Sequence, residues 1–302
     1  MSIGIATKLS KLEWDMHRLG MSRDETIVRY RAEQLDVGKI LDSHERQQEN
    51  IESIVHQVDG THVDILAISA GAARPAIDLL IAMGGDNFFQ LCAYHFNDAA
   101  LVGVNTDPQT SHGALTYFDH DSLERKLPDI AAGRYEIEQW TQIATSLNGQ
   151  RVADASCVVS LAIKATDMVS RYLLKMNGEQ EEQKATGILV AAGAGSRKRA
   201  WYRNAGLYLP QVRLGIYPLV TQEFPVTARE LHTLTREPLG GEDAPYRWLN
   251  HTIPEGASLS LVYWANDPSE LSIDSVKRYE IKEGDELTFW VSEKPLNVVK
   301  NS

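Results

Sequence analysis

The stretch 79–104 restricts the fold more than any other part of the chain. It holds two short apolar runs, Leu79–Met83 and 100–104, separated by Gly84-Gly85-Asp86 and an amphipathic segment. The apolar side of that segment recurs at the spacing of one helix face and consists of Phe88, Leu91, Cys92, His95 and Phe96. Such runs are typical of strands that are buried on both faces and pair in parallel through helical crossovers. The stretch therefore predicts a strand, a Gly-Gly-Asp turn, a helix and a second, parallel strand.

The rest of the first 118 residues alternates helix and strand signals in the same way. Ser22 followed by Glu25 is a capping-box pattern, which predicts the start of a helix. Apolar residues at helical spacing predict a second helix that ends before Gly60, and the apolar run 63–68 predicts another buried strand. We therefore expect an N-terminal α/β domain with a mostly parallel sheet.

From residue 134 onward, strand signals and turns dominate, which predicts a β-rich second domain with antiparallel strands. The expected strands lie in 134–143, 151–163, 170–176, 187–191, 259–264 and 286–291. The expected turns are Asn148-Gly149, Asn177-Gly178, Gly240-Gly241 and Glu283-Gly284. The charged stretch 179–184 is expected to form a solvated hairpin loop. A length of 302 residues also fits two domains.

The charge balance excludes two classes of partner. Lys and Arg number 30 against 41 Asp and Glu, which gives a net charge of −11. Proteins that bind nucleic acids or anionic membranes generally carry an excess of cationic side chains. This chain carries an excess of acidic ones, so we expect neither as a partner. No apolar run approaches the roughly 20 residues of a membrane span, and residues 1–7 lack the features of a secretory signal. Cys92 and Cys157 are too few for a disulfide framework, and we expect a cytoplasmic protein.

The first candidate binding residues lie where the two predicted strands of 79–104 end. Open α/β sheets place ligands at the carboxyl ends of strands, where helix N-termini offer unpaired N–H groups. Gly84 and Gly85 permit close approach of a phosphate, and Asp86 supplies a carboxylate at the same point. That carboxylate is either a base for a substrate hydroxyl or a cap of the following helix. Asn105-Thr106-Asp107 follows the next strand, although these residue types are common in loops.

A third loop, Gly193-Ala194-Gly195-Ser196, follows the run 187–191 and leads into Arg197, Lys198 and Arg199. Glycines and a hydroxyl can form a backbone nest for an anion, and neighbouring cations would strengthen it. The same residues also fit a helix start beside an exposed basic patch. The spacings of a P-loop, a His-Glu-x-x-His metal site and a Gly-x-Ser-x-Gly nucleophile are absent from the sequence.

In their order and spacing, these three loops resemble the NAD kinase family, especially the branch with the mitochondrial-type NAD kinase and its bacterial relatives. Further matches run nearly from end to end and are 7–13, Thr186-Gly187, Tyr202-Arg203-Asn204-Ala205-Gly206, Arg236-Glu237-Pro238, Leu271-Ser272-Ile273-Asp274, Glu283-Gly284-Asp285 and Pro295-Leu296. The resemblance implies an N-terminal α/β domain of residues 1–118, a β-sandwich-like substrate-binding domain of residues 119–284, and a tail, 285–302, that returns to the first domain. It also implies an active site between the two domains and a homodimer or larger assembly.

The resemblance further implies a reaction. ATP, carried with Mg²⁺, would transfer its γ-phosphoryl group to the 2′-hydroxyl of the adenosine ribose of NAD, giving NADP. Asp86 would lie at that hydroxyl, and Mg²⁺ would arrive with the nucleotide rather than at a dedicated protein site. Such transfer depends mainly on positioning and on neutralising charge. The residues expected to bind the nucleotides are Gly84, Gly85, Asn87, Asn105, Thr106, Asp107, Ser160, Thr186, Gly193, Ala194, Gly195, Ser196, Arg197 and Arg199.

Three departures from the family pattern fall on these residues. Asn87 stands where the family has glycine, and Ser160 and Leu161 stand where it has Asn followed by an acid that binds ribose and the nicotinamide side of NAD. The basic run 197–199 lengthens the third loop. Three hypotheses therefore remain: an NAD kinase, a kinase of the same fold with a different nucleotide or nucleoside-like acceptor, and a catalytically weak homologue that binds a nucleotide for regulation.

Overall fold

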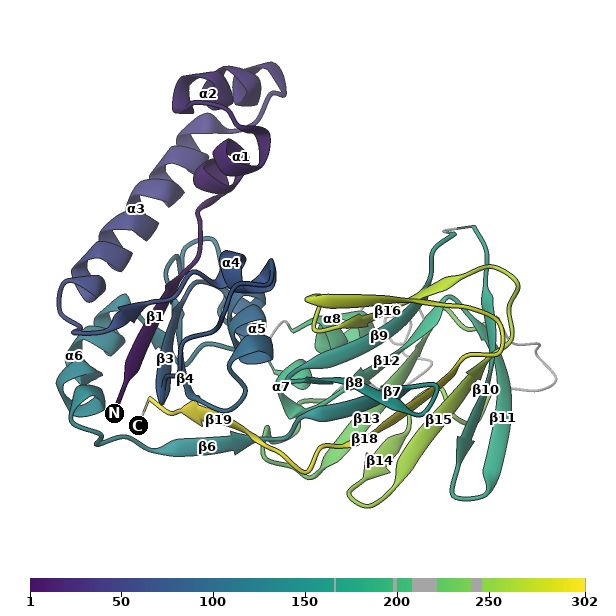
Figure 1. The fold of residues 1–302 in the computed structure, drawn as a ribbon. Coiled ribbons are helices and arrows are strands. Elements are labelled where there is room, and N and C mark those ends of the chain that lie inside the picture. Colours follow the sequence, from purple (N-terminus) through teal and green to yellow (C-terminus); the bar gives the residue numbers. More distant parts are fainter. Residues whose placement is uncertain (166, 198–199, 208–221, 240–245, 302) are drawn as a thin grey trace. The chain divides into compact units, whose positions relative to one another are not determined.

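The chain folds into two units, each with its own sheets and its own apolar core (Figure 1). The structure is a computed structural model that describes residues 1–165, 167–197, 200–207, 222–239 and 246–301. The first unit is Met1–Ile137 with Val298–Ser302, and the second is Glu138–Asn297. The first is α/β and the second is built from antiparallel sheets, so the predicted fold class is confirmed.

The first unit is built on a sheet with the strand order β2-β1-β3-β4-β19-β6 and with β5 beside β4. Its strands are β1 (Ile3–Thr7), β2 (Thr61–His62), β3 (Leu79–Met83), β4 (Ala100–Asn105), β5 (Phe118–Asp119), β6 (Ile137–Trp140) and β19 (Leu296–Val299). β1, β3 and β4 pair in parallel at its centre, and every residue of β3 is buried. The predicted order of strand, Gly-Gly-Asp turn, helix and parallel strand is confirmed.

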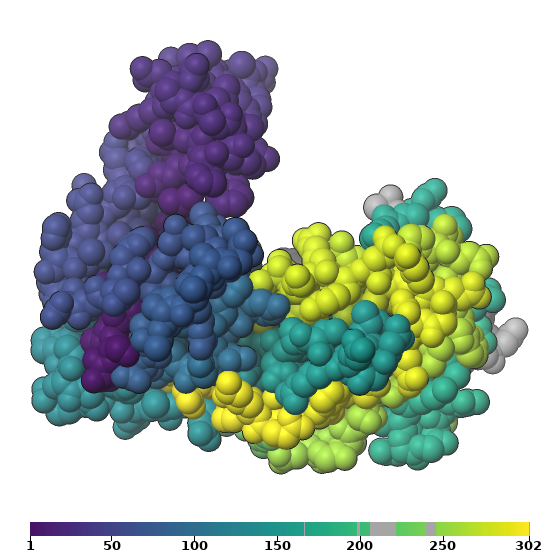
Figure 2. Space-filling view, in the orientation of Figure 1, coloured from purple at the N-terminus to yellow at the C-terminus, as the bar shows by residue number. Residues whose placement is uncertain are grey.

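Among the described residues the first unit also contains six helices: α1 (Lys11–Leu19), α2 (Arg23–Ala32), α3 (Val37–Val55), α4 (Ile65–Ser69), α5 (Asp86–His95) and α6 (His120–Ala131). α3 and α6 pack apolar residues such as Ile54 and Leu127 against the sheet. Capping boxes open α1 at Ser10 and α2 at Ser22, as predicted for Ser22 with Glu25. With the outer half of α3, these two helices form an arm of the first unit that projects beyond the sheet (Figures 1 and 2).

The prediction of a strand at 63–68 is wrong, because this segment contains most of helix α4 (Ile65–Ser69). Asp64 caps α4 by accepting from the main-chain N–H groups of Leu66 and Ala67 at 3.1 and 2.9 Å. Only Val63 and Ile65 of the run are buried. A short apolar run is compatible with either element, and here a side-chain cap selects the helix.

The second unit is a sandwich of two six-stranded antiparallel sheets. One sheet has the order β11 (Glu179–Ala185), β10 (Ser170–Met176), β15 (Ser258–Tyr263), β18 (Glu286–Val291), β7 (Ile143–Leu147) and β8 (Gln150–Ala155). The other has the order β14 (Thr252–Pro254), β13 (Glu230–Arg236), β12 (Gly187–Ala191), β9 (Val158–Ile163), β16 (Ser269–Ile273) and β17 (Lys277–Ile281). Tyr172, Leu259 and Phe289 of the first sheet share one core with Val159, Ile188 and Ile273 of the second.

The turns at Asn148-Gly149, Asn177-Gly178 and Glu283-Gly284 are confirmed, and Gly240-Gly241 lies outside the described residues. The stretch 179–184 is not a loop but most of edge strand β11, which pairs with β10. Part of the strand faces solvent and part faces the sandwich. On the sandwich side, Gln183 is fully buried and accepts a hydrogen bond from the Thr235 hydroxyl at 2.9 Å. An edge strand with one polar, solvated face explains the charge.

The change of unit falls at Glu138, whereas the sequence predicted residue 118. The difference arises because α6, with Leu123 and Ile130, is buried against the parallel sheet. The return to the first unit also occurs later than residue 285, since β18 belongs to the sandwich and Val298 of β19 pairs with Leu101 of β4.

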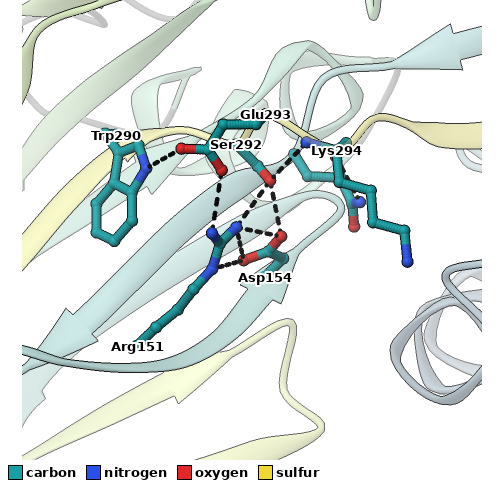
Figure 3. A network of polar contacts seen from close by, with 7 residues as sticks. Arg151, Asp154, Trp290, Ser292, Glu293 and Lys294 are labelled. Carbon is teal, nitrogen blue, oxygen red and sulfur yellow. Dashed lines mark hydrogen bonds and ion pairs between the residues drawn. The ribbon is translucent and has the colours of Figure 1, made fainter.

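A polar network ties hairpin β7–β8 to the chain that leaves β18 (Figure 3). The Arg151 guanidinium donates to both oxygens of Asp154 at 2.8 and 2.9 Å and to Glu293 at 3.0 Å. The Ser292 hydroxyl donates to Asp154 at 2.7 Å, and the Trp290 indole N–H donates to Glu293 at 3.1 Å. The network thereby anchors the chain where it leaves the sandwich.

Replacing Asp154 tests this anchor. Asp154→Ala removes the acceptor of Arg151 and of buried Ser292, so we expect the free energy of unfolding to fall by about 1–3 kcal/mol. Urea denaturation of the full chain measures the loss. Asp129→Ala is the matched control, because it removes an exposed pair with Arg134 and should change stability much less. Equal losses in the two variants would contradict the anchor.

Candidate functional site

The end of strand β3 places Gly84, Gly85 and Asp86 at the start of helix α5. A Cβ on Gly84 would lie 2.8 Å from the Cβ of Phe88 and 2.9 Å from that of Lys8, so a side chain there would force neighbouring atoms apart. Gly85 is the N-cap of α5, and Asp86 is its first residue. The glycines thus let the chain turn tightly from strand to helix and leave the Asp86 carboxylate at the helix N-terminus.

Two main-chain N–H groups hold the Asp86 carboxylate. Ala114 donates to one oxygen at 3.0 Å, and Leu115 donates to the other at 2.8 Å. The loop that supplies them turns at Gly113, whose φ of +58° lies in the left-handed region. Asp86 is half-buried, and an ionised carboxylate offers about four acceptor positions. Asp86 is therefore fixed in place while it keeps capacity for a further donor.

The loop after β4 is held by its own side chains. The Asn105 amide donates to the carbonyl of Ser111 at 2.9 Å, and its oxygen accepts from the Asp107 N–H at 3.2 Å. Asn105, Thr106 and Asp107 are all buried, with 2–6% of their surface exposed. The structure therefore brings these three predicted residues close to the Asp86 loop but gives them intramolecular partners.

Asp107 is a buried anchor between this loop and helix α3. Its carboxylate accepts from the Ser43 hydroxyl at 2.5 Å and the Thr110 hydroxyl at 2.6 Å, and the Arg46 guanidinium lies at 3.4 Å. Burial raises the pKa of Asp107, but the hydrogen bonds from Ser43 and Thr110 and the charge of Arg46 outweigh it and lower the pKa below its ordinary value. Asp107 is therefore ionised and saturated by the chain itself.

Sequence reasoning missed the α3 residues that contact this loop. Ser43, Arg46 and Asn50 lie at i, i+3 and i+7, on one face of the helix, and the Asn50 amide donates to the carbonyl of Thr106 at 3.0 Å. Their polar spacing was visible in the sequence, but nothing local indicated that a loop some 60 residues later would cover them.

In the second unit, the predicted glycine loop is the short, buried helix α7 (Gly193–Ser196). A Cβ on Gly193 would lie 2.2 Å from the carbonyl oxygen of Pro225, and one on Gly195 would lie 2.6 Å from that of Cys157. The Ser196 hydroxyl donates to the carbonyl of Gly193 at 2.7 Å and accepts from the Phe224 N–H at 3.0 Å. The lack of side chains at Gly193 and Gly195 therefore lets the main chain of Pro225 and Cys157 pack directly against α7.

Arg197 follows α7 with its guanidinium 5.5 Å from the Trp140 ring centroid, in cation–π range. Lys198 and Arg199, the rest of the predicted basic run, lie outside the described residues. Arg197 is the part of the run that the structure places, and it faces Trp140, the last residue of β6, which lies after the second unit begins at Glu138.

The other predicted residues of the second unit lie on strand β9 and at the start of strand β12. Ser160 is 3% exposed on β9 and pairs with Leu189 of β12 and Ser272 of β16, while Leu161 is in the sandwich core. Thr186 lies before β12 and bonds to the carbonyl of Arg236, so it is at the opposite end of the strand from Gly193. The structure does not bring Thr186 and the glycine loop together.

Asp274 is a second buried carboxylate to which sequence reasoning gave no role. It accepts from the main-chain N–H groups of Ser156, Cys157 and Val158 at 2.6, 3.1 and 2.8 Å and from the Ser156 hydroxyl at 2.8 Å. Burial raises its pKa, and these hydrogen bonds oppose the rise. Because the carbonyl of Cys157 bonds to Ala192, Asp274 supports the segment against which α7 packs.

The described part of the chain contains neither a metal-binding cluster of side chains nor a membrane-spanning helix. None of its groups of three His, Cys, Asp or Glu side chains could hold a metal ion. None of its helices is long and apolar enough to cross a membrane.

The sequence is similar to kinases from several organisms, although no family model matches the chain. It is 25% identical over 214 residues to the NAD kinase of Thermomicrobium roseum, a match that covers 70% of this chain and 66% of that protein. It is 25% identical over 247 residues to the NAD kinase of Thermoplasma volcanium, with 80% and 77% covered. A probable NADH kinase of rice, Oryza sativa, is 26% identical over 238 residues, with 70% and 67% covered.

Two solved structures share the fold. Yeast NADH kinase complexed with NADH aligns with 100% of this chain and 84% of its own, at a TM-score of 0.67 and 14% identity. An NAD kinase from Archaeoglobus fulgidus in complex with ATP aligns with 100% and 94%, at a TM-score of 0.62 and 14% identity. In sequence the chain is similar to NAD kinases, and its fold is that of the two solved kinases. The predicted resemblance to the NAD kinase family is thereby confirmed, while the branch within it stays a prediction.

The packing of α7 generates a prediction about stability. Gly193→Ala places a Cβ against the main chain of Pro225 and Val226, which cannot move aside like a flexible side chain, so we expect a loss of more than about 2 kcal/mol in unfolding free energy. Gly149→Ala is the control, because its turn has a φ of +78° but no atom within 4 Å, and only left-handed strain of about 1 kcal/mol applies. If urea denaturation gives the two variants equal losses, the packing argument fails.

The ionised anchor generates a pH prediction. Because folding lowers the pKa of Asp107, its contribution to stability is present above its unfolded pKa and is lost as the pH falls through its folded pKa. The unfolding free energy of the wild type should therefore decline more steeply than that of Asp107→Asn between about pH 5 and pH 2. Urea denaturation at a series of pH values measures both slopes, and parallel curves would show that Asp107 is not the depressed group.

Proposed function

We propose that this chain is a phosphotransferase that moves the γ-phosphoryl group of ATP, bound with Mg²⁺, to the 2′-hydroxyl of the adenosine ribose of NAD. Relatives in sequence are NAD kinases and a probable NADH kinase, and solved relatives in fold include complexes with NADH and with ATP. These names support the nucleotide class of both substrates. NAD is the proposed acceptor, with NADH as its alternative redox form.

The position of Asp86 is the observation that carries the proposal. A half-exposed carboxylate at the N-terminus of a ten-residue helix, fixed by two N–H groups, is suited to accept a hydrogen bond from a substrate hydroxyl. The helix dipole and the N–H groups at the start of the helix favour phosphate oxygens at the same end. One group thus orients the acceptor while the helix end stabilises negative charge.

Asp86 accepts the proton of the ribose 2′-hydroxyl as that oxygen forms a bond to the γ-phosphorus. The bond between the γ-phosphorus and the oxygen bridging it to the β-phosphate breaks, and ADP leaves with the bonding electron pair. Positioning supplies most of the rate in such transfers, and Mg²⁺ on the nucleotide neutralises the developing charge.

The other predicted ligands divide by exposure. Asn87 is exposed beside Asp86 and remains in the proposal as a substrate contact, as does the backbone of Gly84 and Gly85. Asn105, Thr106 and Asp107 enter the proposal as supports of the loop, since each already has an intramolecular partner. In the second unit Ser160, Thr186, α7, Arg197 and Arg199 are proposed as nucleotide contacts on the family resemblance and not on exposure, since Ser160 and α7 are buried.

A different acceptor is the second candidate function, and Leu161 favours it. In the family resemblance this position carries an acid that binds the acceptor, whereas Leu161 is 1% exposed in the sandwich core and supplies no polar group. Together with Asn87 in place of glycine, this change would alter contacts to the nicotinamide side rather than the phosphoryl-transfer step.

Turnover of a substrate panel tests the proposal. The purified full chain is incubated with ATP and Mg²⁺ and, separately, with NAD, NADH, nucleosides and nucleotides, and products are identified by mass. We expect NAD to gain one phosphoryl group and Asp86→Asn to lower kcat by at least about 100-fold, because the variant cannot take the proton. Asp59→Asn, an exposed position outside the site, is the control and should retain full activity.

The alternatives give different results in the same assay. A phosphorylated product from another acceptor, with neither NAD nor NADH modified, would replace the first function by the second. Binding of ATP without turnover of any acceptor would identify a nucleotide-binding regulatory homologue. Full activity of Asp86→Asn would remove Asp86 from the mechanism.

The proposal includes the homodimer or larger homo-oligomer that the family resemblance implied and the cytoplasmic location expected from the sequence features, with small nucleotides as partners. Sedimentation velocity of the purified chain measures its mass in solution, and a monomer at all concentrations would contradict the dimer.

A further inference from the structure

We propose that one face of helix α3, formed by Ser43, Arg46 and Asn50, positions Asp86 by holding the loop after β4 through the Asp107 carboxylate and the Thr106 carbonyl. These helix residues are positioning residues rather than ligands of substrate. The inference deepens the proposed function and rests on it for its effect on catalysis, but its structural part can be measured without turnover.

The first step of the connection runs from α3 to the loop after β4. The Ser43 hydroxyl donates to one oxygen of Asp107 at 2.5 Å, and the Arg46 guanidinium faces the other at 3.4 Å. The Asn50 amide donates to the carbonyl of Thr106 at 3.0 Å. The Gln47 amide donates to the Ser43 hydroxyl at 3.0 Å and so orients the Ser43 proton toward Asp107. Helix α3 thus donates hydrogen bonds both to a side chain and to the main chain of the loop.

The second step runs from Asp107 along the loop. Its side chain accepts from the Thr110 hydroxyl at 2.6 Å, and its carbonyl accepts from the N–H groups of Thr110 and Ser111 at 3.2 and 2.9 Å. The carbonyl of Ser111 in turn accepts from the Asn105 amide at 2.9 Å. These bonds close residues 105–111 into a compact turn whose shape depends on the Asp107 carboxylate.

The third step runs from the turn to Asp86. Gly113 follows it in the left-handed region, where a Cβ would lie 2.4 Å from the Thr116 hydroxyl and 2.8 Å from the Asn105 amide nitrogen. The next two residues, Ala114 and Leu115, direct their N–H groups to the Asp86 carboxylate. A shift of the turn therefore moves the two donors that hold Asp86.

Burial distinguishes this role from ligand binding. Asp107 is 5% exposed and each of its carboxylate oxygens already faces a donor, so a nucleotide could not reach it without breaking the contacts to α3. Asp86 is half-buried, and within the described residues its carboxylate accepts from two main-chain N–H groups. Of the two carboxylates, one is accessible to a substrate and the other holds the loop that fixes it.

Substitutions on α3 test the proposal in the full chain. Ser43→Ala removes the shortest bond to Asp107, and Asn50→Ala removes the main-chain contact. We expect kcat to fall about tenfold in each variant, with KM for ATP and NAD changing less than about threefold, because orientation of the base is lost rather than binding. Ser43→Thr keeps the hydroxyl and should restore kcat. Glu49→Ala, on the exposed face of the same helix, is the control and should match the wild type.

A double substitution separates positioning from general destabilisation. If Ser43 acts through Asp86, then Ser43→Ala should lower kcat by less than about twofold in a chain that already carries Asp86→Asn. A further tenfold loss in that background would overturn the proposal, because the two residues would then act independently.

Amide hydrogen exchange gives the readout that does not depend on activity. The Ala114 and Leu115 N–H groups should exchange at least about tenfold faster in Ser43→Ala and in Asn50→Ala than in the wild type or Glu49→Ala, while amides of strand β3 keep their rates. Unchanged exchange at Ala114 and Leu115 in both variants would overturn the positioning role. A wild type that phosphorylates no acceptor would instead overturn the proposed function and leave this measurement to decide the positioning role alone.

Discussion

The bonds from Ala114 and Leu115 to the Asp86 carboxylate are the constraint on which the site of the first unit depends. They join the end of β3 to the loop after β4, and that loop is in turn held by Asp107 against α3. The Asp86 and Asp107 carboxylates are bonded to the same loop but differ in burial and in their hydrogen-bond partners. Asp107 is buried and saturated by hydroxyls and a guanidinium, which keeps it ionised, whereas Asp86 is half-exposed and retains acceptor capacity.

Close packing of the chain explains the glycines in both units without reference to a ligand. Gly84 lies against Phe88 and Lys8, and Gly193 and Gly195 lie against the main chain of other segments. A glycine-rich loop after an apolar strand is typical of phosphate sites, but close chain packing requires the same residue type. At β3 the packing leaves a helix N-terminus with a half-exposed carboxylate. At α7 it buries Ser196 completely, with its hydroxyl bonded to the chain itself.

Much of the central sheet was predictable because its signals are local. Leu79–Met83 is apolar throughout and is followed by glycines and a periodic helix, so strand, turn and helix were predicted together. The runs 63–68 and 179–184 were not, since a cap at Asp64 and pairing with β10 decide them. The roles of Ser43, Asp107 and Asp274 were also beyond local reasoning, because each is defined by partners more than 60 residues away. Asp86 could be singled out from sequence because its glycine neighbours and helix start adjoin it.

The central claim is that the acceptor hydroxyl of the substrate meets Asp86. A crystal structure of the chain with NAD, a non-hydrolysable ATP analogue and Mg²⁺ tests it most directly. The account predicts the ribose 2′-oxygen within about 3.2 Å of an Asp86 carboxylate oxygen, with the bonds to Ala114 and Leu115 intact. NAD bound with its ribose away from Asp86, or an Asp86 carboxylate reached by no substrate atom, would contradict it.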